Sequence, residues 1–383
     1  MIDQIRISNF KCFDALHLDL APLTLLTGYN AAGKSTALQA LLLLAQTLRS
    51  SREGTNLLVN GPILSLGTPG DILNTRASSK SLTLGASRER ERVDWHFGVA
   101  PEDRRLLTIA QVEVQDDKGG EIMECDRLDG LRPEWGRAHG LVEELESLIY
   151  LSAARQVETE IFPSCFDARL LRGDVGAIGQ YATWWLRELG DQEPSPMRIH
   201  PQTQGPTTIR QQANAWLGEL FPGAEANALQ LAQTSLMQLQ LRSGVTSDWV
   251  RPANIGYGIS YAFPILVSGL CTDKGRSLVI DSPEAHLHPR GQSAIGRFLA
   301  RIAHSGIQVL VETHSDHFLN GVRIAVKEQT IEPKDVAVYF FTGRTDSSVV
   351  RLSLDRNGTL HDLPEGFFDQ AEQDLAHLAG WTI

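Results

Sequence analysis

The sequence predicts an α/β protein that combines a mainly parallel sheet with a group of antiparallel strands. An apolar run, Leu23 to Thr27, leads through a glycine-containing loop into a helical pattern. Two further apolar strands, 277–281 and 308–312, flank a helix over 290–304, and such a strand–helix–strand unit favours parallel pairing. The segments within 80–125 instead alternate apolar and polar residues, which is typical of antiparallel strands with one exposed face.

Periodicity and turn residues predict the remaining elements. Short strands are expected over 2–28, a helix over 140–150, and mainly helical structure over 165–220, where several prolines interrupt it. Residues 228–242 alternate like a strand, although their Ala, Gln and Leu content also permits a helix. The C-terminal part predicts a hairpin over 336–355 and a last helix over 367–378.

Length, charge and cysteine usage exclude several classes of protein. The chain has 383 residues, which predicts one large domain with an insertion, or two domains. Its net charge of -11 argues against sequence-independent coating of nucleic acid, which needs a basic face, and leaves a local basic patch as an alternative. The four cysteines are scattered, as is typical of reduced thiols, and no signal or membrane-spanning segment is evident. We therefore expect a cytoplasmic protein without a membrane partner.

The strongest motif is the loop GYNAAGKS between the first apolar run and the helix that follows it. It matches the phosphate-binding pattern GxxxxGK[ST] in full and has the flanking strand and helix that this pattern requires. Glycines let backbone amides curl around phosphate oxygens, and a helix N-terminus favours negative charge. Lys34 suits the outer phosphates, and the Ser35 hydroxyl suits Mg²⁺. The candidate nucleotide-binding residues are Gly28, Asn30, Ala31, Ala32, Gly33, Lys34, Ser35 and Thr36.

A second motif, SLVIDSPEAHLHP, places acidic residues at the end of an apolar strand. Asp281 ends this strand, where it suits a Mg²⁺ ion contacted directly or through water. Glu284 follows three residues later, across a turn made by Pro283, where it can reach an attacking water as a general base. We therefore expect Asp281 to be a metal ligand with a catalytic role and Glu284 to be catalytic.

Two further motifs carry weaker signals. In VLVETHS an apolar strand delivers His314 just beyond its end, and ligands bind at this edge of a parallel sheet. His314 is thus a candidate hydrogen-bond donor to the γ-phosphate. The motif GYGIS contains Gly256, Gly258 and Ser260 and precedes an apolar helix, and small residues with a serine at a helix start can bind an anion.

Taken in this order, the four motifs resemble those of the ABC-type ATPases of the SMC, RecF and OLD lineage, most closely the compact bacterial ATPases with PEAHLHP and ETHSD motifs. The opening RISNFKCF, the turn VNGP and the closing PEGFFDQ extend the resemblance over nearly the whole chain. It implies an ATPase head with a P-loop mixed sheet, an antiparallel β subdomain and an α/β insertion. Residues 28–36 then form the Walker A loop, Gly256 to Ser260 the signature, Asp281 the Walker B acid and His314 the switch histidine.

The resemblance also implies how the chain is divided and assembled. It predicts an N-terminal lobe over 1–79 with Walker A, an inserted region of strands and helices over 80–250, and a C-terminal lobe over 251–383 with the other motifs. ATP would join two copies head to tail into a homodimer. Ser260 of each copy would then complete the ATP site of the other.

The sequence departs from the general pattern of this family directly after the Walker B acid. Most ABC ATPases have Glu at that position, and this chain has Ser282. Either Glu284 takes over as general base, or hydrolysis is slow and the protein acts more as a switch. No Gln is clearly placed as the usual Q-loop metal contact, for which Gln46 and Asp71 are both candidates.

Two other interpretations of polar residues are less favoured. A zinc site would need polar residues at the strand ends, and the ATPase interpretation already accounts for those residues. The residues concerned are Glu284, His286, His288, His314 and His317. A DNA-facing role for three arginines competes with an ion-paired surface position. These arginines are Arg155, Arg169 and Arg172.

We expect an ATPase engine in which ATP joins two heads and hydrolysis separates them. Through the 80–250 insertion it would drive or gate a protein partner, and the resemblance suggests phage defence or DNA maintenance. The alternative is an ATP-gated binding switch with little turnover that controls a separate effector, such as a nuclease. A built-in OLD-type nuclease is not predicted, because no D-x-D pair follows His314. A long coiled coil is not predicted either, because no heptad pattern is sustained.

Overall fold

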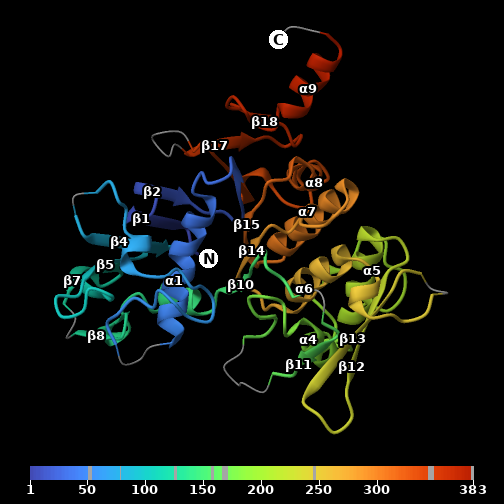
Figure 1. The fold of residues 1–383 in the computed structure, drawn as a ribbon, viewed down its shortest axis with the longest axis horizontal. Helices are drawn as coiled ribbons and strands as arrows, with labels where there is room; N and C mark the ends of the chain where they lie inside the picture. The colour runs from blue at the N-terminus through green and yellow to red at the C-terminus, as the bar shows by residue number, and fades with distance from the viewer. Residues whose placement is uncertain are drawn as a thin grey trace.

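A computed structural model of the chain contains two large sheets with helices between and beside them (Figure 1). The residues that the structure describes are 1–50, 54–77, 79–124, 127–156, 159–165, 171–244, 247–343 and 349–380. Two smaller sheets, of three and two strands, lie in the same ranges. The strands predicted within 80–125 lie in one large sheet, and those of the predicted strand–helix–strand unit lie in the other.

The larger sheet has seven strands in the order β10-β14-β15-β3-β16-β17-β18. The first five are parallel to one another, and the last two are antiparallel to their neighbours. Its central strands are buried on both faces, which explains their continuous apolar runs. The bounds are β10 Ile149–Leu151, β14 Ser277–Asp281, β15 Gln308–Glu312, β3 Leu23–Gly28, β16 Val336–Phe341, β17 Val349–Leu354 and β18 Leu360–His361.

The second large sheet has six antiparallel strands in the order β2-β1-β4-β5-β6-β7. Their bounds are β1 Gln4–Phe10, β2 Phe13–Asp19, β4 Ser81–Arg88, β5 Glu91–Val99, β6 Leu107–Asp116 and β7 Gly119–Met123. Because β4 pairs with β1, the strands expected within 80–125 continue the sheet that the N-terminal strands begin. The division into segments 1–79, 80–250 and 251–383 stays a prediction.

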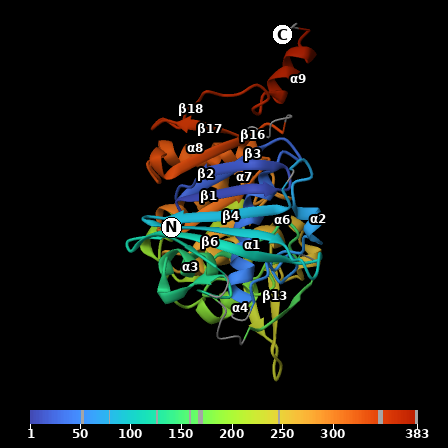
Figure 2. The same cartoon turned by 90° about the vertical axis from the view of Figure 1, so that its left-hand side faces the viewer.

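Helix α1 (Lys34–Ser50) lies behind the antiparallel sheet and fills the core that the two large sheets share (Figure 2). Leu310 and Val279 of the parallel sheet face this core, whereas Leu278 and Ile280 face a second core on the other side. Successive strand residues point to opposite faces, so the central strands support both cores at once. The helix α3 (His139–Glu146) packs on α1, and the short helix α2 spans Pro69–Ile72.

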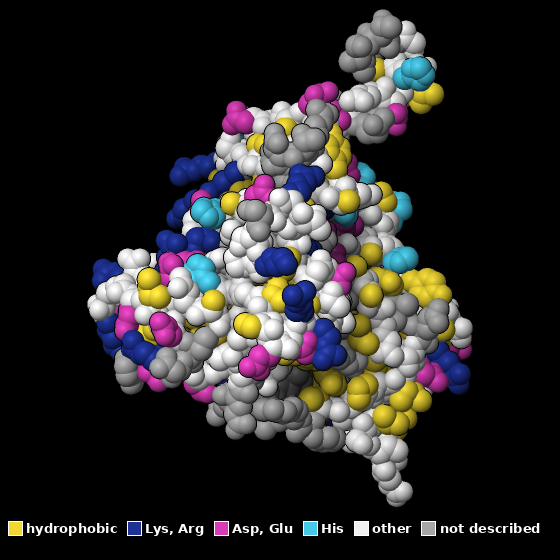
Figure 3. Space-filling view, turned by 60° about the vertical axis from the view of Figure 1, so that its left-hand side comes forward, with side chains coloured by type: hydrophobic (Ala, Val, Ile, Leu, Met, Phe, Trp, Pro, Cys, Tyr) yellow, Lys and Arg dark blue, Asp and Glu magenta, His cyan; other side chains and the backbone are white. Residues whose placement is uncertain are grey.

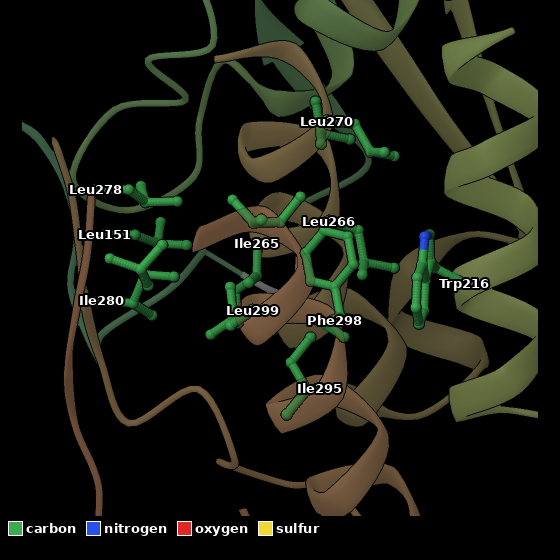
Figure 4. Packing of buried hydrophobic residues seen from close by; sticks show 14 of the residues in the cluster. Leu151, Trp216, Ile265, Leu266, Leu270, Leu278, Ile280, Ile295, Phe298 and Leu299 are labelled. Carbon is green, nitrogen blue, oxygen red and sulfur yellow. The ribbon is translucent and has the colours of Figure 1, made fainter. Parts of the chain in front are cut away.

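Helices cover the other face of the parallel sheet. Their bounds are α5 Ile209–Leu220, α6 Tyr257–Cys271, α7 Pro289–His304 and α8 Asp316–Lys327, with α4 Ala182–Leu189 beside α6. Figure 4 shows Ile265 and Phe298 from two of these helices, with Leu278 and Ile280 of β14 beyond them. The Trp216 ring of α5 lies 5.1 Å from the Phe298 ring. This packing fixes the end of β14 relative to the start of α6.

Three predictions of secondary structure were wrong in part. The described residues 171–181 form turns, because several glycines there adopt left-handed backbone angles, so helix is confined to α4 and α5 within the 165–220 region. Residues 228–242 belong to two strands, β12 (Glu225–Gln230) and β13 (Leu236–Arg242), which pair with each other and, through β13, with β11 (Ile161–Pro163). The helix expected over 140–150 ends at Glu146, because β10 begins at Ile149.

The C-terminal hairpin and helix follow the prediction. β16 and β17 pair as expected, and the residues 344–348 between them lie outside the described part of the chain. Helix α9 (Gln370–Leu378) projects from the body of the molecule (Figure 1). Within the described ranges, no helix combines the length and apolar character needed to cross a bilayer. The two-stranded sheet consists of β8 (Leu128–Asp129) and β9 (Arg132–Pro133).

Candidate functional site

The predicted phosphate-binding loop connects β3 to α1 and requires glycine at both ends. Gly28 has φ of 129°, and a Cβ there would lie 2.2 Å from the backbone oxygen of Phe341. Gly33 has φ of 102°, and its Cβ would lie 2.5 Å from the Phe13 ring. Any side chain at either position would therefore meet both an unfavourable backbone angle and a collision. The loop is tight because strand β16 and the first β-hairpin close around it.

The Lys34 side chain is held under this loop. Its Nζ donates hydrogen bonds to the carbonyls of Gly28, at 3.0 Å, and Tyr29, at 2.7 Å, and the residue is only 3% exposed. Burial lowers the pKa of Lys34, and the charges of Glu312, Asp281 and Glu284 oppose that shift. The charges of three nearby carboxylates therefore favour the ammonium form of Lys34.

Two of these carboxylates come from neighbouring strand ends. Asp281 ends β14 and Glu312 ends β15, and the two residues are paired in the sheet register. The Ser35 hydroxyl donates a hydrogen bond to Glu312 Oε1 at 2.8 Å. Glu312 was not among the site residues predicted from the sequence, although it ends an apolar strand just as Asp281 does. The signal was present, but the strand order that brings Glu312 beside Ser35 is a tertiary feature.

The oxygen ligands at this edge fit a magnesium ion. The pKa of Glu312 is raised to about 7, mainly by burial and also by the Asp281 charge, although the Ser35 hydrogen bond and the Lys34 charge act in the opposite direction. Two adjacent carboxylates in a buried place repel each other, and a divalent cation would relieve that repulsion. Mg²⁺ is typically held by one or two carboxylates together with phosphate and water oxygens. Ser35, Asp281 and Glu312 supply such a set.

Glu284 is fixed by the turn that follows β14. Ser282 adopts a left-handed φ of 49°, which costs roughly 1–2 kcal/mol for a residue with a side chain. The turn is held by Ser282 N, which donates to Glu312 O at 2.9 Å, and Ser282 Oγ, which donates to Asp281 Oδ1 at 2.8 Å. Glu284 Oε1 then accepts a hydrogen bond from His314 N at 2.8 Å. Its Oε2 is buried without a partner in the described part of the chain, and burial raises the pKa of Glu284.

His314 and the loop line one cavity of about 260 Å³. Burial lowers the pKa of His314, and the Lys34 charge acts in the same direction, which favours the neutral imidazole. The structure therefore brings most of the predicted loop together with His314, and adds Cys12 and Glu312, which the sequence analysis had not assigned. The lining residues are Cys12, Asn30, Ala31, Ala32, Gly33, Lys34, Ser35, Thr36, Glu312 and His314.

The signature segment at the start of α6 differs from the prediction at its serine. Ser260 lies inside the helix, is 4% exposed, and its hydroxyl has no hydrogen-bond partner in the described structure. Since α6 begins at Tyr257, helical periodicity turns position 260 toward the core rather than toward a second copy. Gly256 and Tyr257 are exposed instead, and Gly258 permits close approach, because a Cβ there would lie 2.7 Å from His286 O.

Neither candidate for the Q-loop contact lies at the cavity. Gln46 is fully buried, and its amide group bonds the backbone of Leu58, Ile63 and Leu64. Asp71 accepts hydrogen bonds from Thr68 at the start of α2. Both side chains therefore stabilise local loops, and we withdraw both as metal contacts.

The zinc interpretation finds no support in the described residues, which hold no group of three or more His, Cys, Asp or Glu side chains placed to bind a metal. The His286 ring instead packs at 4.4 Å from the ring of Tyr261. His288 is the N-cap of α7 and accepts a hydrogen bond from Arg290 N.

Of the three arginines for which a DNA-facing role competed with an ion-paired position, the two that the structure describes do not form an exposed basic surface. Arg155 is 4% exposed and donates to backbone carbonyls beside β14, so it cannot reach DNA. Arg172 is partly exposed and pairs with Asp273 at 3.6 Å, and Arg169 lies outside the described residues. On the face drawn in Figure 3, Lys and Arg side chains are interspersed with Asp and Glu.

Three family models match parts of the chain. One described as "AAA ATPase domain" matches residues 1–93, and one described as "AAA domain, putative AbiEii toxin, Type IV TA system" matches 218–320. A third, "Protein of unknown function (DUF3696)", matches 331–378. The OLD nuclease of Thermus scotoductus (strain ATCC 700910 / SA-01) is 25% identical over 360 residues, which cover 83% of this chain and 60% of that protein. The chain thus spans about 60% of the length of this relative.

Two solved structures have a similar fold. One is the SmcHead bound to the C-winged helix domain of ScpA, with a TM-score of 0.50 and 13% identity over 93% of this chain and 98% of that chain. The other is the Smc head domain with an extended coiled coil bound to the C-terminal domain of ScpA derived from Pyrococcus furiosus. It has a TM-score of 0.50 and 12% identity over 99% of each chain. At these identities the likeness concerns the fold, and it confirms the predicted fold class.

Proposed function

We propose that this chain, an ABC-type ATPase of the SMC, RecF and OLD lineage, binds ATP with Mg²⁺ at the loop 28–36 and hydrolyses it as a homodimer. The observation that carries the proposal is the position of three carboxylates beside the loop. Glu312 bonds Ser35, Asp281 pairs with Glu312 in the sheet register, and Glu284 accepts a hydrogen bond from His314 N. A phosphate loop alone would serve many binding proteins. Acidic residues at the adjacent strand ends add the groups that phosphoryl transfer to water needs.

In the proposed reaction the loop amides and Lys34 hold the phosphates. Ser35, Asp281 and Glu312 would hold Mg²⁺, which when bound neutralises charge on the phosphates. Glu284 accepts the proton of the attacking water, and its pKa, which burial raises, makes it a stronger base than an exposed glutamate. His314 donates a hydrogen bond to a γ-phosphate oxygen. The Glu284–His314 contact keeps base and donor in a fixed relation.

The second candidate function is an ATP-gated switch with little turnover. Ser282 favours it, because this side chain bonds Asp281 where most ABC ATPases place a carboxylate. In either case ATP would join two copies through the exposed start of α6, and the dimer would act on a protein partner. The solved neighbours are bound to domains of ScpA, which supports a protein partner in this fold. A cytoplasmic role in phage defence or DNA maintenance, with an effector such as a separate nuclease, completes this proposal.

The test compares the wild type with Glu284→Gln and with Glu332→Gln, an exposed glutamate paired with Lys334, as the matched control. We expect slow ATP hydrolysis by the wild type and by the control. Glu284→Gln should bind ATP with unchanged affinity, turn it over at least about 100-fold more slowly, and remain dimeric in ATP–Mg²⁺. Turnover is measured as phosphate release, affinity by calorimetry, and mass by light scattering.

The outcomes separate the two candidates. If the wild type and Glu284→Gln bind ATP equally and neither releases phosphate, the protein is a switch. If Glu284→Gln hydrolyses ATP as fast as the control, another group is the base. A wild type that binds no ATP contradicts both functions.

A further inference from the structure

Arg155 is buried beside the strand ends that carry the carboxylates. It lies in the loop after β10, and β10 is the parallel neighbour of β14, which ends at Asp281. The residue is 4% exposed, and an arginine buried to this extent needs hydrogen-bond or charge partners. Two backbone hydrogen bonds hold its loop, from Ser152 N to Ala177 O and from Gln156 N to Ile178 O. Arg155 thus reaches the site from a well-anchored element.

Its guanidinium group connects two elements of the site. Nη2 donates to Asp281 O at 2.5 Å, and Nη1 donates to Ser282 O at 3.1 Å. Its Cζ lies 5.6 Å from the centroid of the Tyr261 ring, a cation–π distance. Tyr261 belongs to the first part of α6, and its ring also lies 4.4 Å from that of His286. One side chain therefore links the turn after β14 to the helix that begins with the signature segment.

The turn that Arg155 contacts sets the position of Glu284. Ser282 holds its left-handed backbone angle only because its neighbours fix it, and Arg155 supplies donors for two carbonyls of that turn. Burial lowers the pKa of Arg155 to about 10, while the Asp281 and Glu284 charges favour the cation. The group thus remains charged at neutral pH. Arg155, like Asp281 and Glu284, is not among the residues that line the cavity beside the loop.

We propose that Arg155 is a positioning residue for hydrolysis, which holds Asp281 and Glu284 in place and connects them to α6. This inference rests on the proposed ATPase function. Because the loop 28–36 would hold the phosphates without help from Arg155, its loss slows turnover and leaves ATP affinity nearly unchanged. Because Tyr261 contacts both Arg155 and His286, a second copy bound at the start of α6 influences the carboxylates through the same contacts.

The test compares Arg155→Lys and Tyr261→Leu with Arg172→Lys as a matched control. Lysine keeps the charge but lacks the planar fork that reaches two carbonyls and the ring together. In Arg155→Lys we expect kcat for ATP to fall at least about 10-fold, with KM and the ATP Kd changing less than about 3-fold. Tyr261→Leu should lower kcat in the same way but less. Arg172 also donates to a backbone carbonyl, that of Cys271, and its replacement should change none of the three constants.

An unchanged kcat with a lowered melting temperature in Arg155→Lys would leave a structural role only and overturn the proposal. A parallel loss of ATP binding would overturn it as well. If Arg155→Lys does not fold, Tyr261→Leu tests the same contact from α6. An unchanged kcat in Tyr261→Leu would then overturn the proposal. A wild type that binds ATP without turnover also overturns the proposal, whereas a wild type that binds no ATP defeats the proposed function itself.

Discussion

Two helices of this protein begin at glycine-containing turns, and the two turns differ in what surrounds them. Before α1, Cβ atoms on Gly28 and Gly33 would collide with the Phe341 backbone and the Phe13 ring. Before α6, a Cβ on Gly256 would meet nothing within 4 Å. The first turn is enclosed and has Lys34 and carboxylates around it, whereas the second is open and presents an exposed Tyr257.

This difference indicates which step of the proposed ATPase cycle, ATP binding or dimerisation, each turn can support. An enclosed loop is preorganised in one copy and can bind phosphate without rearrangement. An open turn has few contacts of its own, so it contributes only when another surface covers it. We therefore assign ATP binding to the α1 turn of a single copy and dimerisation to the α6 turn. That assignment predicts effects of different kinds for substitutions at the two turns.

Replacing Lys34 should have the largest effect. Lys34→Ala removes the charge that faces the outer phosphates, so the ATP Kd should rise at least about 100-fold, as measured by calorimetry with ATP–Mg²⁺. Lys334→Ala, which removes a surface lysine paired with Glu332, is the matched control and should bind as the wild type does. Normal affinity in Lys34→Ala would show that the enclosed turn is not the nucleotide site.

The same contrast explains how much could be predicted from sequence. The tight glycine loop, both strand ends and the parallel unit follow from local patterns, because glycine geometry and buried strands leave clear signals in residues 23–36 and 277–312. Ser260 is buried where the sequence predicted a contact with a second copy, because its direction depends on where α6 begins. Glu312 was missed because strand order is a tertiary property. Arg155 was placed at the surface for a related reason, since nothing near it in sequence indicates the turn after β14 that its guanidinium contacts.

Two substitutions distinguish the role of the exposed α6 turn in dimerisation from that of the buried Ser260. Tyr257→Glu puts a negative charge on the exposed turn, where it should repel the phosphates bound by the other copy. We expect the dimerisation constant in ATP–Mg²⁺ to weaken at least about 10-fold by light scattering, with ATP binding to single copies unchanged. Ser260→Ala should leave the dimer intact and raise stability slightly, because it removes a buried hydroxyl without a partner. Loss of dimer in Ser260→Ala alone would restore the signature role to Ser260.

The smallest effect concerns the acid that bonds the first turn of α1. The pKa of Glu312 is raised to about 7 in the folded chain from its ordinary value of 4.5, mainly by burial. Between these values the folded chain holds a proton that the unfolded chain has released, so the free energy of unfolding falls as pH rises through this window. Above pH 7 the charged Glu312 lowers the free energy of unfolding by its full amount, which is at most about 3 kcal/mol. Glu312→Gln removes the charge and keeps an acceptor for Ser35.

Melting temperatures without nucleotide, in a metal chelator, should therefore be higher for Glu312→Gln than for the wild type by several degrees at pH 8, and the difference should shrink toward pH 5. Glu332→Gln is the control. Lys334 lowers the pKa of the exposed Glu332, so any effect of its titration on the melting temperature falls below pH 5. Adding ATP–Mg²⁺ should narrow the difference at pH 8, since a cation at the carboxylates offsets their repulsion. A difference that is constant from pH 5 to pH 8 would mean that Glu312 does not titrate there, and the enclosed turn would then lose the electrostatic feature that distinguishes it from the start of α6.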